Sequence, residues 1–138
     1  MKLSLHILTP DKEVLKEEVD EVLVPTVTGE LGILPEHESL LTQIQPGELT
    51  IITDGKRRSY AITGGYLEVN NNQVNILGDY AIRSDEIEVS KAEDAKKRAE
   101  ARMKENVSEE EFAEIEAQLR RSLLELKVAH KNRRTRPQ

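Results

Sequence analysis

The sequence contains no cysteine and no tryptophan, and it has only one phenylalanine and three tyrosines. Without cysteine, the chain can form neither a disulfide nor a thiolate metal site. Its three histidines, His6, His37 and His130, share no helical or hairpin spacing that would bring two of them to one metal ion. No apolar run approaches the ~20 residues that cross a bilayer, and the N-terminus lacks a basic segment followed by an apolar one. We therefore expect a soluble, unprocessed protein without a metal site.

Charge is distributed unevenly along the 138 residues, a length that suits one packed domain with a smaller appendage. Residues 1–86 contain 7 Lys and Arg against 15 Asp and Glu, whereas residues 87–138 contain 13 against 11. An acidic first part and a basic last part suggest two modules that face different surroundings or face each other. We therefore expect a domain boundary near residue 86.

Residues 1–86 show the alternation of apolar and polar side chains that is typical of half-buried β-strands. In residues 2–8, Leu3, Leu5 and Ile7 fall on one side of the strand and the polar residues between them on the other. A second, valine-rich strand is ended by Pro25. The core of this part is therefore expected to consist mostly of Val, Ile and Leu.

Two turn motifs join further alternating segments. Asp54-Gly55 separates residues 49–53 from 58–63, and an Asn-Asn-Asn run at 70–72 separates residues 66–69 from 73–77. Aspartate, asparagine and glycine accept the left-handed backbone that tight hairpin turns require. Short strands with turn signals about every 8 to 12 residues predict an N-terminal antiparallel β-sandwich over residues 1–86.

After Ser84 the pattern changes to that of helices. Residues 90–93 (Ser-Lys-Ala-Glu) and 108–111 (Ser-Glu-Glu-Glu) both match the capping box, in which a serine hydroxyl accepts a hydrogen bond from the third following N–H. They predict helices that begin near Lys91 and Glu109. Because the turn at residues 105–107 is short, the two helices are expected to form an antiparallel hairpin within residues 87–138.

Each predicted helix has one apolar face. The residues on these faces are Ala92, Ala95, Ala99 and Met103 on the first helix, and Phe112, Ile115, Leu119, Leu123 and Leu126 on the second. Burying a leucine contributes about 1.5 to 3 kcal/mol, whereas ordering a residue costs about 1 to 2 kcal/mol, and alanine buries little area. We therefore expect a marginally stable hairpin that leans on a partner or on the β domain and detaches at a modest cost.

Two other classes of function fit the sequence poorly. A basic C-terminus is compatible with nucleic-acid binding, but the net charge is -6 and few aromatic side chains are present for base stacking. An enzyme would need a nucleophile beside a base or a pair of carboxylates in a loop, and the sequence offers no such constellation. We predict no catalytic residue and no nucleic-acid partner.

Four motifs occur in a fixed order along the chain. They are Val24-Pro25-Thr26, Gly29-Glu30-x-Gly32-Ile33-Leu34-Pro35-x-His37, Pro46-Gly47 and Gly64-Gly65. Together with the charged, alanine-rich helical pair, this ordered set resembles the epsilon subunit family of the rotary F-type ATP synthases, in its bacterial type. The resemblance covers nearly the whole chain. It implies a non-catalytic subunit of the central stalk that takes part in ATP synthesis without making or breaking bonds.

The resemblance also implies partners for the β-sandwich. It places this domain between the gamma subunit and the membrane ring that carries protons, so that proton flow turns the stalk. Leu31, Ile33 and Leu34 would pack at that junction, Glu30 would lie near the ring and His37 near gamma. Membrane association would occur only through the complex, at the cytoplasmic face of a bacterial plasma membrane, with the thylakoid membrane as the alternative.

A structural interpretation exists for each of these residues. Ile33 and Leu34 could begin a buried strand, which leaves only Leu31 for a partner, and Glu30 and His37 could be solvated. The Gly64-Gly65 pair favours a sharp bend or a close backbone approach over an anion site, because no helix follows it.

For the helical hairpin, the resemblance implies two positions. In one it lies folded on the sandwich, and in the other it extends along gamma, blocks rotation and inhibits ATP hydrolysis. The basic residues that would then meet acidic surface on the catalytic alpha and beta subunits are Arg120, Arg121, Lys127, Lys131, Arg133 and Arg134. The alternative is a solvated helix face with a disordered basic tail.

ATP is the one regulatory ligand that the resemblance suggests. Many bacterial members bind it through a segment of the form Ile/Leu-Asp-x-x-Arg-Ala, with help from arginines of the second helix. The matching residues are Ile87, Glu88, Lys91 and Ala92, and both polar positions differ from the motif. Glutamate displaces the carboxylate by a methylene, and lysine cannot reproduce the planar fork of arginine. Arg120 or Arg121 would be the helix arginine in such a site.

Overall fold

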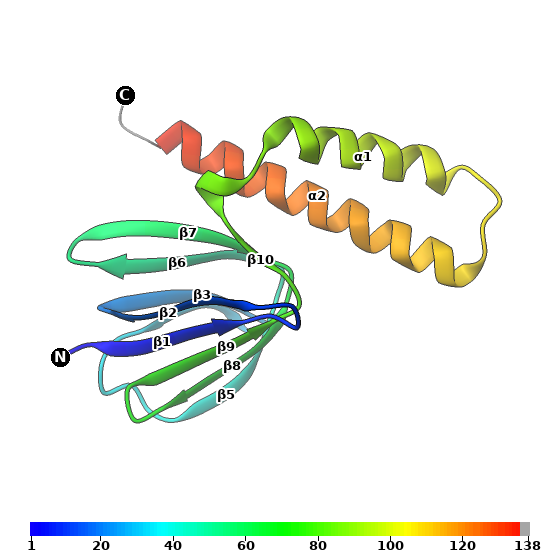
Figure 1. Ribbon diagram of the computed structural model, residues 1–138. Coiled ribbons are helices and arrows are strands. Elements are labelled where there is room, and N and C mark those ends of the chain that lie inside the picture. The colour runs from blue at the N-terminus through cyan, green and yellow to red at the C-terminus, as the bar shows by residue number, and fades with distance from the viewer. Residues whose placement is uncertain (136–138) are drawn as a thin grey trace. The chain divides into compact units, whose positions relative to one another are not determined.

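The computed structural model describes residues 1–135, and for residues 134 and 135 it describes the backbone alone (Figure 1). The chain divides into two units, residues 1–83 and 84–138. The division lies three residues before the predicted boundary at residue 86. The reason is a short 3-10 helix, η1 (Ser84–Glu86), which belongs with the helices that follow it.

The first unit is built of β-strands. Within the described residues these are β1 (Leu3–Leu8), β2 (Glu13–Val19), β3 (Glu21–Thr26), β4 (Gly29–Ile33), β5 (Leu40–Ile44), β6 (Gly47–Thr53), β7 (Lys56–Ile62), β8 (Gly65–Asn70), β9 (Gln73–Gly78) and β10 (Ala81–Arg83). They form one sheet in the order β10-β7-β6-β3-β5-β8-β9-β1-β2, with β4 paired to β3. The sequence prediction of an antiparallel β-sandwich followed by a two-helix hairpin is confirmed as the fold class.

Buried and outward-facing side chains alternate along the strands and show where the core of this unit lies. Leu3, Leu5 and Ile7 of β1 are fully buried, as are Leu67 of β8 and Ile76 of β9, while their chain neighbours face outward. The cluster consists almost entirely of Val, Ile and Leu, as predicted. Burial of one row of side chains fixes the register, because a slip of one residue would turn that row toward solvent.

Both predicted hairpin turns are present. Asp54 and Gly55 have φ angles of 52° and 77° and connect β6 to β7, and Asn71 and Asn72 have φ angles of 50° and 62° and connect β8 to β9. Two successive residues with positive φ are the mark of the type I′ turn.

One pairing differs from the predicted antiparallel pattern. Strand β1 lies parallel to β9, with Leu5 beside Val74 and Ile7 beside Ile76. Parallel neighbours need a long connection, and here strands β2 to β8 provide it. Alternation in the sequence identifies strands but carries no information about which strands become neighbours, so this pairing was not predictable.

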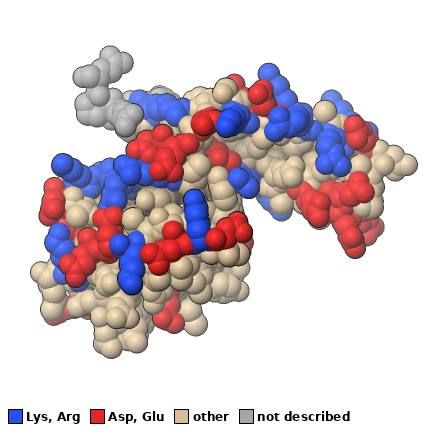
Figure 2. Space-filling view, viewed as in Figure 1, with Lys and Arg blue, Asp and Glu red and all other residues tan. Residues whose placement is uncertain are grey.

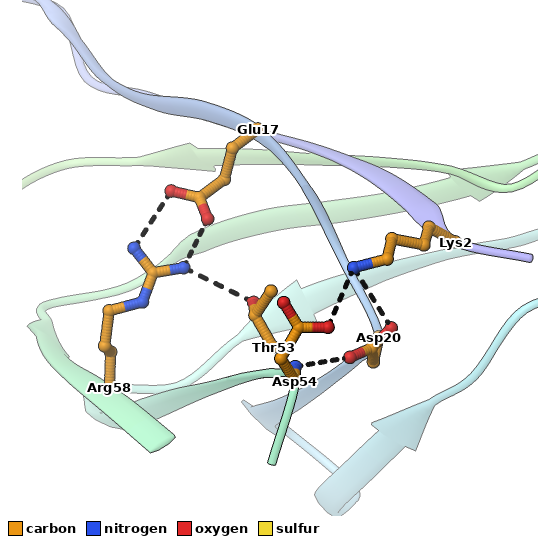
Figure 3. Close-up of polar contacts among 6 residues, drawn as sticks. All are labelled: Lys2, Glu17, Asp20, Thr53, Asp54 and Arg58. Carbon is orange, nitrogen blue, oxygen red and sulfur yellow. Dashed lines mark hydrogen bonds and ion pairs between the residues drawn. The ribbon is translucent and has the colours of Figure 1, made fainter. Parts of the chain in front are cut away.

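Polar contacts join β2, the last strand in the sheet order, to the hairpin of β6 and β7 (Figure 3). The Arg58 guanidinium donates two hydrogen bonds to the Glu17 carboxylate, one of them 2.9 Å long from Nη1. The Asp20 N–H donates to the Ile52 carbonyl at 2.9 Å, and the Asp20 carboxylate accepts from the Asp54 N–H at 2.6 Å. These contacts hold an edge strand against the rest of the sheet.

Gly64 and Gly65 serve the backbone, as the structural interpretation predicted. Gly65 has a φ of 142°, and a Cβ atom built there would lie 1.9 Å from the Leu77 carbonyl oxygen. The bend therefore brings β8 against the end of β9 at a distance that only glycine permits.

The second unit contains two long helices, α1 (Val89–Met103) and α2 (Glu109–Thr135). The capping role predicted for Ser108 is confirmed, since its hydroxyl accepts a hydrogen bond from the Glu111 N–H at 3.1 Å. The prediction for Ser90 was wrong. Helix α1 begins at Val89 with Glu88 as its N-cap residue, and no side-chain hydrogen bond caps it. Ser90 already lies inside the helix, where its backbone cannot adopt the extended conformation of a cap.

Small residues form much of the seam of the helical hairpin. The residues buried at seven-residue intervals are Ala92 and Ala99 on α1, and Ile115, Ser122 and Ala129 on α2. The Ser122 hydroxyl donates to the Gln118 carbonyl at 3.0 Å, which satisfies its polar group. Phe112 and Leu123, predicted to lie in the apolar face, remain exposed. Ile115 and Val128 are the larger buried side chains of α2, and Leu119 and Leu126 of the predicted face are half-buried.

We predict that Gly65→Ala lowers the free energy of unfolding of the β unit by more than about 3 kcal/mol, because the methyl group meets a backbone carbonyl. Gly55→Ala is the matched control, since Gly55 also has a positive φ but a Cβ atom there would have no atom within 4 Å. It should cost only about 1 kcal/mol. Urea unfolding followed by tyrosine fluorescence measures both, and equal losses would contradict the close approach.

We further predict that Glu17→Gln lowers stability at pH 7 by about 1 kcal/mol, because a partly exposed, bidentate ion pair is lost. Hydrogen bonds from Arg58 lower the pKa of Glu17, so this contribution is present at neutral pH and lost as the pH falls through the lowered pKa. The difference from the wild-type chain should therefore vanish in strong acid.

Glu18→Gln provides the control for this experiment. It removes the same charge from the next position of β2, where the side chain points to the opposite face and is exposed. Urea unfolding as a function of pH compares the two variants. A loss for Glu17→Gln that is independent of pH would show that the ion pair does not produce it.

Candidate functional site

The motif-rich segment after β3 forms a tight turn and a short strand. The Thr26 hydroxyl donates to the Gly29 carbonyl at 2.6 Å and accepts from the Thr28 N–H at 3.3 Å. Gly29 has a φ of 117°, which favours glycine at this position. Strand β4 then runs back along β3, with Glu30 opposite Pro25. The turn is thus held by its own hydrogen bonds.

The residues predicted to contact partners in this segment differ in exposure. Glu30 is exposed, whereas Leu31 is half-buried and packs against the core. Ile33 is fully buried, so its side chain belongs to the core, as the structural interpretation had it. That interpretation was wrong about the strand, which ends at Ile33 and leaves Leu34 outside it. Leu34 lies just beyond the strand with 56% of its surface exposed. Leu34 is therefore the apolar side chain of this motif that faces outward.

His37 lies in a loop that is anchored to the turn between β8 and β9. Its N–H donates to the Leu34 carbonyl at 3.2 Å, and its Nδ1 lies 2.8 Å from the Glu38 carbonyl oxygen. Glu36, with a φ of 69°, donates its N–H to the Asn72 Oδ1 at 2.5 Å. Local hydrogen bonds thus hold the half-buried His37 in place. The loop itself is supported by the turn between β8 and β9, which is distant in sequence.

Exposed apolar side chains also gather on the outer face of the sheet. Leu41 of β5, Tyr66 of β8 and Leu77 of β9 are 71%, 56% and 52% exposed, and half-buried Leu8 of β1 adjoins them. The register places Tyr66 opposite Leu77, and Leu77 beside Leu8. These four residues are called the outer apolar patch. Single apolar residues on a surface need no explanation, but neighbouring apolar side chains from four strands indicate a contact surface.

Sequence reasoning did not find the outer apolar patch. Its signal was the pair of apolar residues, one facing each side of the sheet, at Leu40-Leu41 and at Tyr66-Leu67. Such pairs break the simple alternation, and recognising them as a patch requires the order of the strands.

The basic residues predicted for the hairpin lie along α2. Arg120 pairs with Glu116 at 2.6 Å, and Arg121 pairs with Glu125 at 3.5 Å, each within the helix. Lys127, Lys131 and Arg133 have exposed side chains further along, and the Arg134 side chain lies outside the described residues. Figure 2 shows Lys and Arg interspersed with Asp and Glu over the visible side of the helices. The hairpin surface is therefore mixed in charge.

The segment that resembles an ATP-binding motif is engaged in contacts of its own. Lys91 pairs with Glu88 at 2.8 Å, and both side chains are largely exposed. Ile87 and Ala92 are buried, and the Ile87 carbonyl accepts a hydrogen bond from Arg133. Arg133, which the resemblance did not suggest, therefore reaches this segment, and ATP binding here stays a prediction.

A cluster of three or more His, Asp or Glu residues that could hold a metal ion is absent from the described residues. Among the helices within residues 1–135, none is long and apolar enough to cross a membrane.

Two family models match the chain over nearly its whole length. The ATP synthase delta/epsilon chain beta-sandwich domain matches residues 2–84, and the delta/epsilon chain long alpha-helix domain matches residues 85–130. These ranges follow the two units of the structure.

Individual proteins agree with the family models. The chain is 48% identical to the ATP synthase epsilon chain of Herpetosiphon aurantiacus over 99% of both chains, and 46% identical to that of Dehalococcoides mccartyi over 96% of both. A chain in the solved OSCP/F1/c-ring structure of the Euglena gracilis mitochondrial ATP synthase is 28% identical, with a TM-score of 0.71 over 94% of this chain and 81% of that one. The protein therefore belongs to the ATP synthase delta/epsilon chain family, as a non-catalytic subunit of the central stalk.

Proposed function

We propose that this protein joins the proton-carrying membrane ring to the gamma subunit of an ATP synthase and restrains ATP hydrolysis through its helical hairpin. Membership of the delta/epsilon chain family supports the assignment. The observation that supports the proposed contact with gamma and the ring is the outer apolar patch, because its side chains lie on the side of the sheet that faces away from the core. The complex would lie on the cytoplasmic face of a bacterial plasma membrane, with this subunit bound peripherally.

The outer apolar patch suits the gamma subunit. Its side chains come from strands β1, β5, β8 and β9, whose inward faces are packed in the core, so the surface is rigid before binding. Each large apolar side chain buried at an interface contributes about 1.5 to 3 kcal/mol, and a neighbouring group of them forms the centre of a stable contact. His37 approaches gamma from the loop that leads into β5.

Strand β4, which contains Glu30, and Leu34 just beyond it are suited to contact the ring. Leu34 supplies an exposed apolar contact, Glu30 an exposed carboxylate for polar loops, and Leu31 a half-buried neighbour. Ile33 anchors this segment from below, since its side chain is in the core. Transmission of torque needs such anchoring, because a loosely held loop would yield before the stalk turned.

The hairpin suits a regulatory role for energetic reasons. Its seam includes alanine and serine, which bury little area, so separation of the two helices costs less than disruption of the β core. In the extended position, the basic residues of α2 would meet acidic surface on the catalytic alpha and beta subunits. Attraction of this kind is weakened by salt, so inhibition should be salt-dependent.

We predict that Leu77→Asp raises the dissociation constant for purified gamma subunit about tenfold or more, because it buries a charge in the apolar contact. Leu34→Asp should leave gamma affinity unchanged but lower proton-driven ATP synthesis in vesicles that contain the reassembled enzyme. Calorimetric titration with gamma and the synthesis assay measure the two effects separately.

Ser4→Asp is the matched control, since Ser4 is exposed on the same outer face of β1 but lies outside the outer apolar patch. It adds the same charge without removing an apolar contact, and gamma binding should persist. Equal affinity of the Leu77→Asp and Ser4→Asp variants for gamma would overturn the assignment of the patch.

A further inference from the structure

The last turns of α2 contact the segment that precedes α1. The Arg133 Nη2 donates a hydrogen bond of 2.9 Å to the carbonyl oxygen of Ile87, 46 positions earlier in the chain. Ile87 is buried, and its carbonyl lies before the first acceptor of α1, because the Ala92 N–H bonds to the Glu88 carbonyl at 3.0 Å. Arg133 therefore satisfies a backbone group that the helix itself does not use.

This contact differs from that of Arg120. Arg120 pairs with Glu116 one turn away on its own helix, so this contact persists whether or not α1 is present. Arg133 instead joins two separate parts of the hairpin. At the other end, Arg102 of α1 lies 3.9 Å from Glu111 of α2, with both side chains about half exposed. Arg102 and Glu111 thus provide a cross-link near the turn of the hairpin, and Arg133 provides one at its open end.

The seam between these cross-links is narrow. Ala92 and Ala99 of α1 contribute only methyl groups, and Ser122 and Ala129 of α2 are similarly small, whereas Ile115 and Val128 are larger buried side chains of α2. Because the α1 side of the seam buries little apolar area, a hydrogen bond from a charged donor contributes measurably to keeping the open end paired. Arginine suits this position, since its guanidinium is always charged and a cation near the C-terminal end of a helix is favourable.

We propose that Arg133 is a latch that closes the open end of the helical hairpin and sets how readily α1 and α2 separate. The functional consequence of the latch rests on the proposed function, since the latch would delay inhibition only if separation of α1 from α2 inhibits hydrolysis. As a property of the free chain it is independent of that function.

Residue-resolved amide hydrogen exchange on the full chain tests the latch. In the Arg133→Gln variant, exchange of the Ala92 and Ala129 amides should rise about fivefold, the effect of one net hydrogen bond, while the Ile115 amide near the turn stays unchanged. Arg133→Lys, which keeps the charge and a donor, should give a smaller rise. Arg120→Gln is the matched control and should leave the open end as it is, because it removes the same charge from a contact within α2.

Unchanged exchange of Ala92 and Ala129 in Arg133→Gln, or an equal rise in Arg120→Gln, would overturn the latch. Hydrolysis by the enzyme reassembled with Arg133→Lys separates this result from failure of the proposed function, because this variant keeps the charge that is proposed to meet the catalytic subunits. Faster exchange together with stronger inhibition supports both. Faster exchange with unaltered inhibition supports the latch and contradicts the inhibitory role of the hairpin.

Discussion

Burial of one row of side chains in the β-sheet is the constraint on which the rest of the first unit depends. Leu67 and Ile76 are fully buried, and this fixes the outward direction of Tyr66 and Leu77, their chain neighbours. A shift of one residue would exchange the two rows and bury the polar residues of the outer face. The packing that stabilises the fold therefore also determines which apolar side chains are left for a partner. Gly65 permits the bend that brings β8 to its place beside β9.

The two units differ in how they are stabilised, and this difference matches their proposed roles. Large aliphatic side chains from strands that are distant in sequence meet in the β core, so this unit is suited to hold its partners under torque. The helical hairpin relies on small residues in its seam and on polar contacts near its ends. Its separation is correspondingly less costly, as a regulatory element requires.

Much of the fold could be predicted from the sequence, because strands, turns and helices leave local signals. The Asp54-Gly55 turn, the asparagine turn and the Ser108 cap were all predicted from neighbouring residues and are present. Features that depend on distant contacts were not predictable. These include the parallel pairing of β1 with β9, the outer apolar patch and the contact of Arg133 with Ile87. Glu30, Leu31, Ile33 and His37 were proposed from resemblance, and the structure distinguishes buried Ile33 from exposed Glu30 and from half-buried Leu31 and His37.

The most direct test of the division between a binding unit and an inhibitory unit is a comparison of two chains in the reassembled enzyme. One chain ends at Arg83, where the β unit ends, and the other is complete. We predict that the shortened chain supports proton-driven ATP synthesis as well as the complete chain does, and that ATP hydrolysis is faster with it. Equal rates of hydrolysis with the two chains, or loss of synthesis with the shortened one despite a folded β unit, would contradict this division of roles.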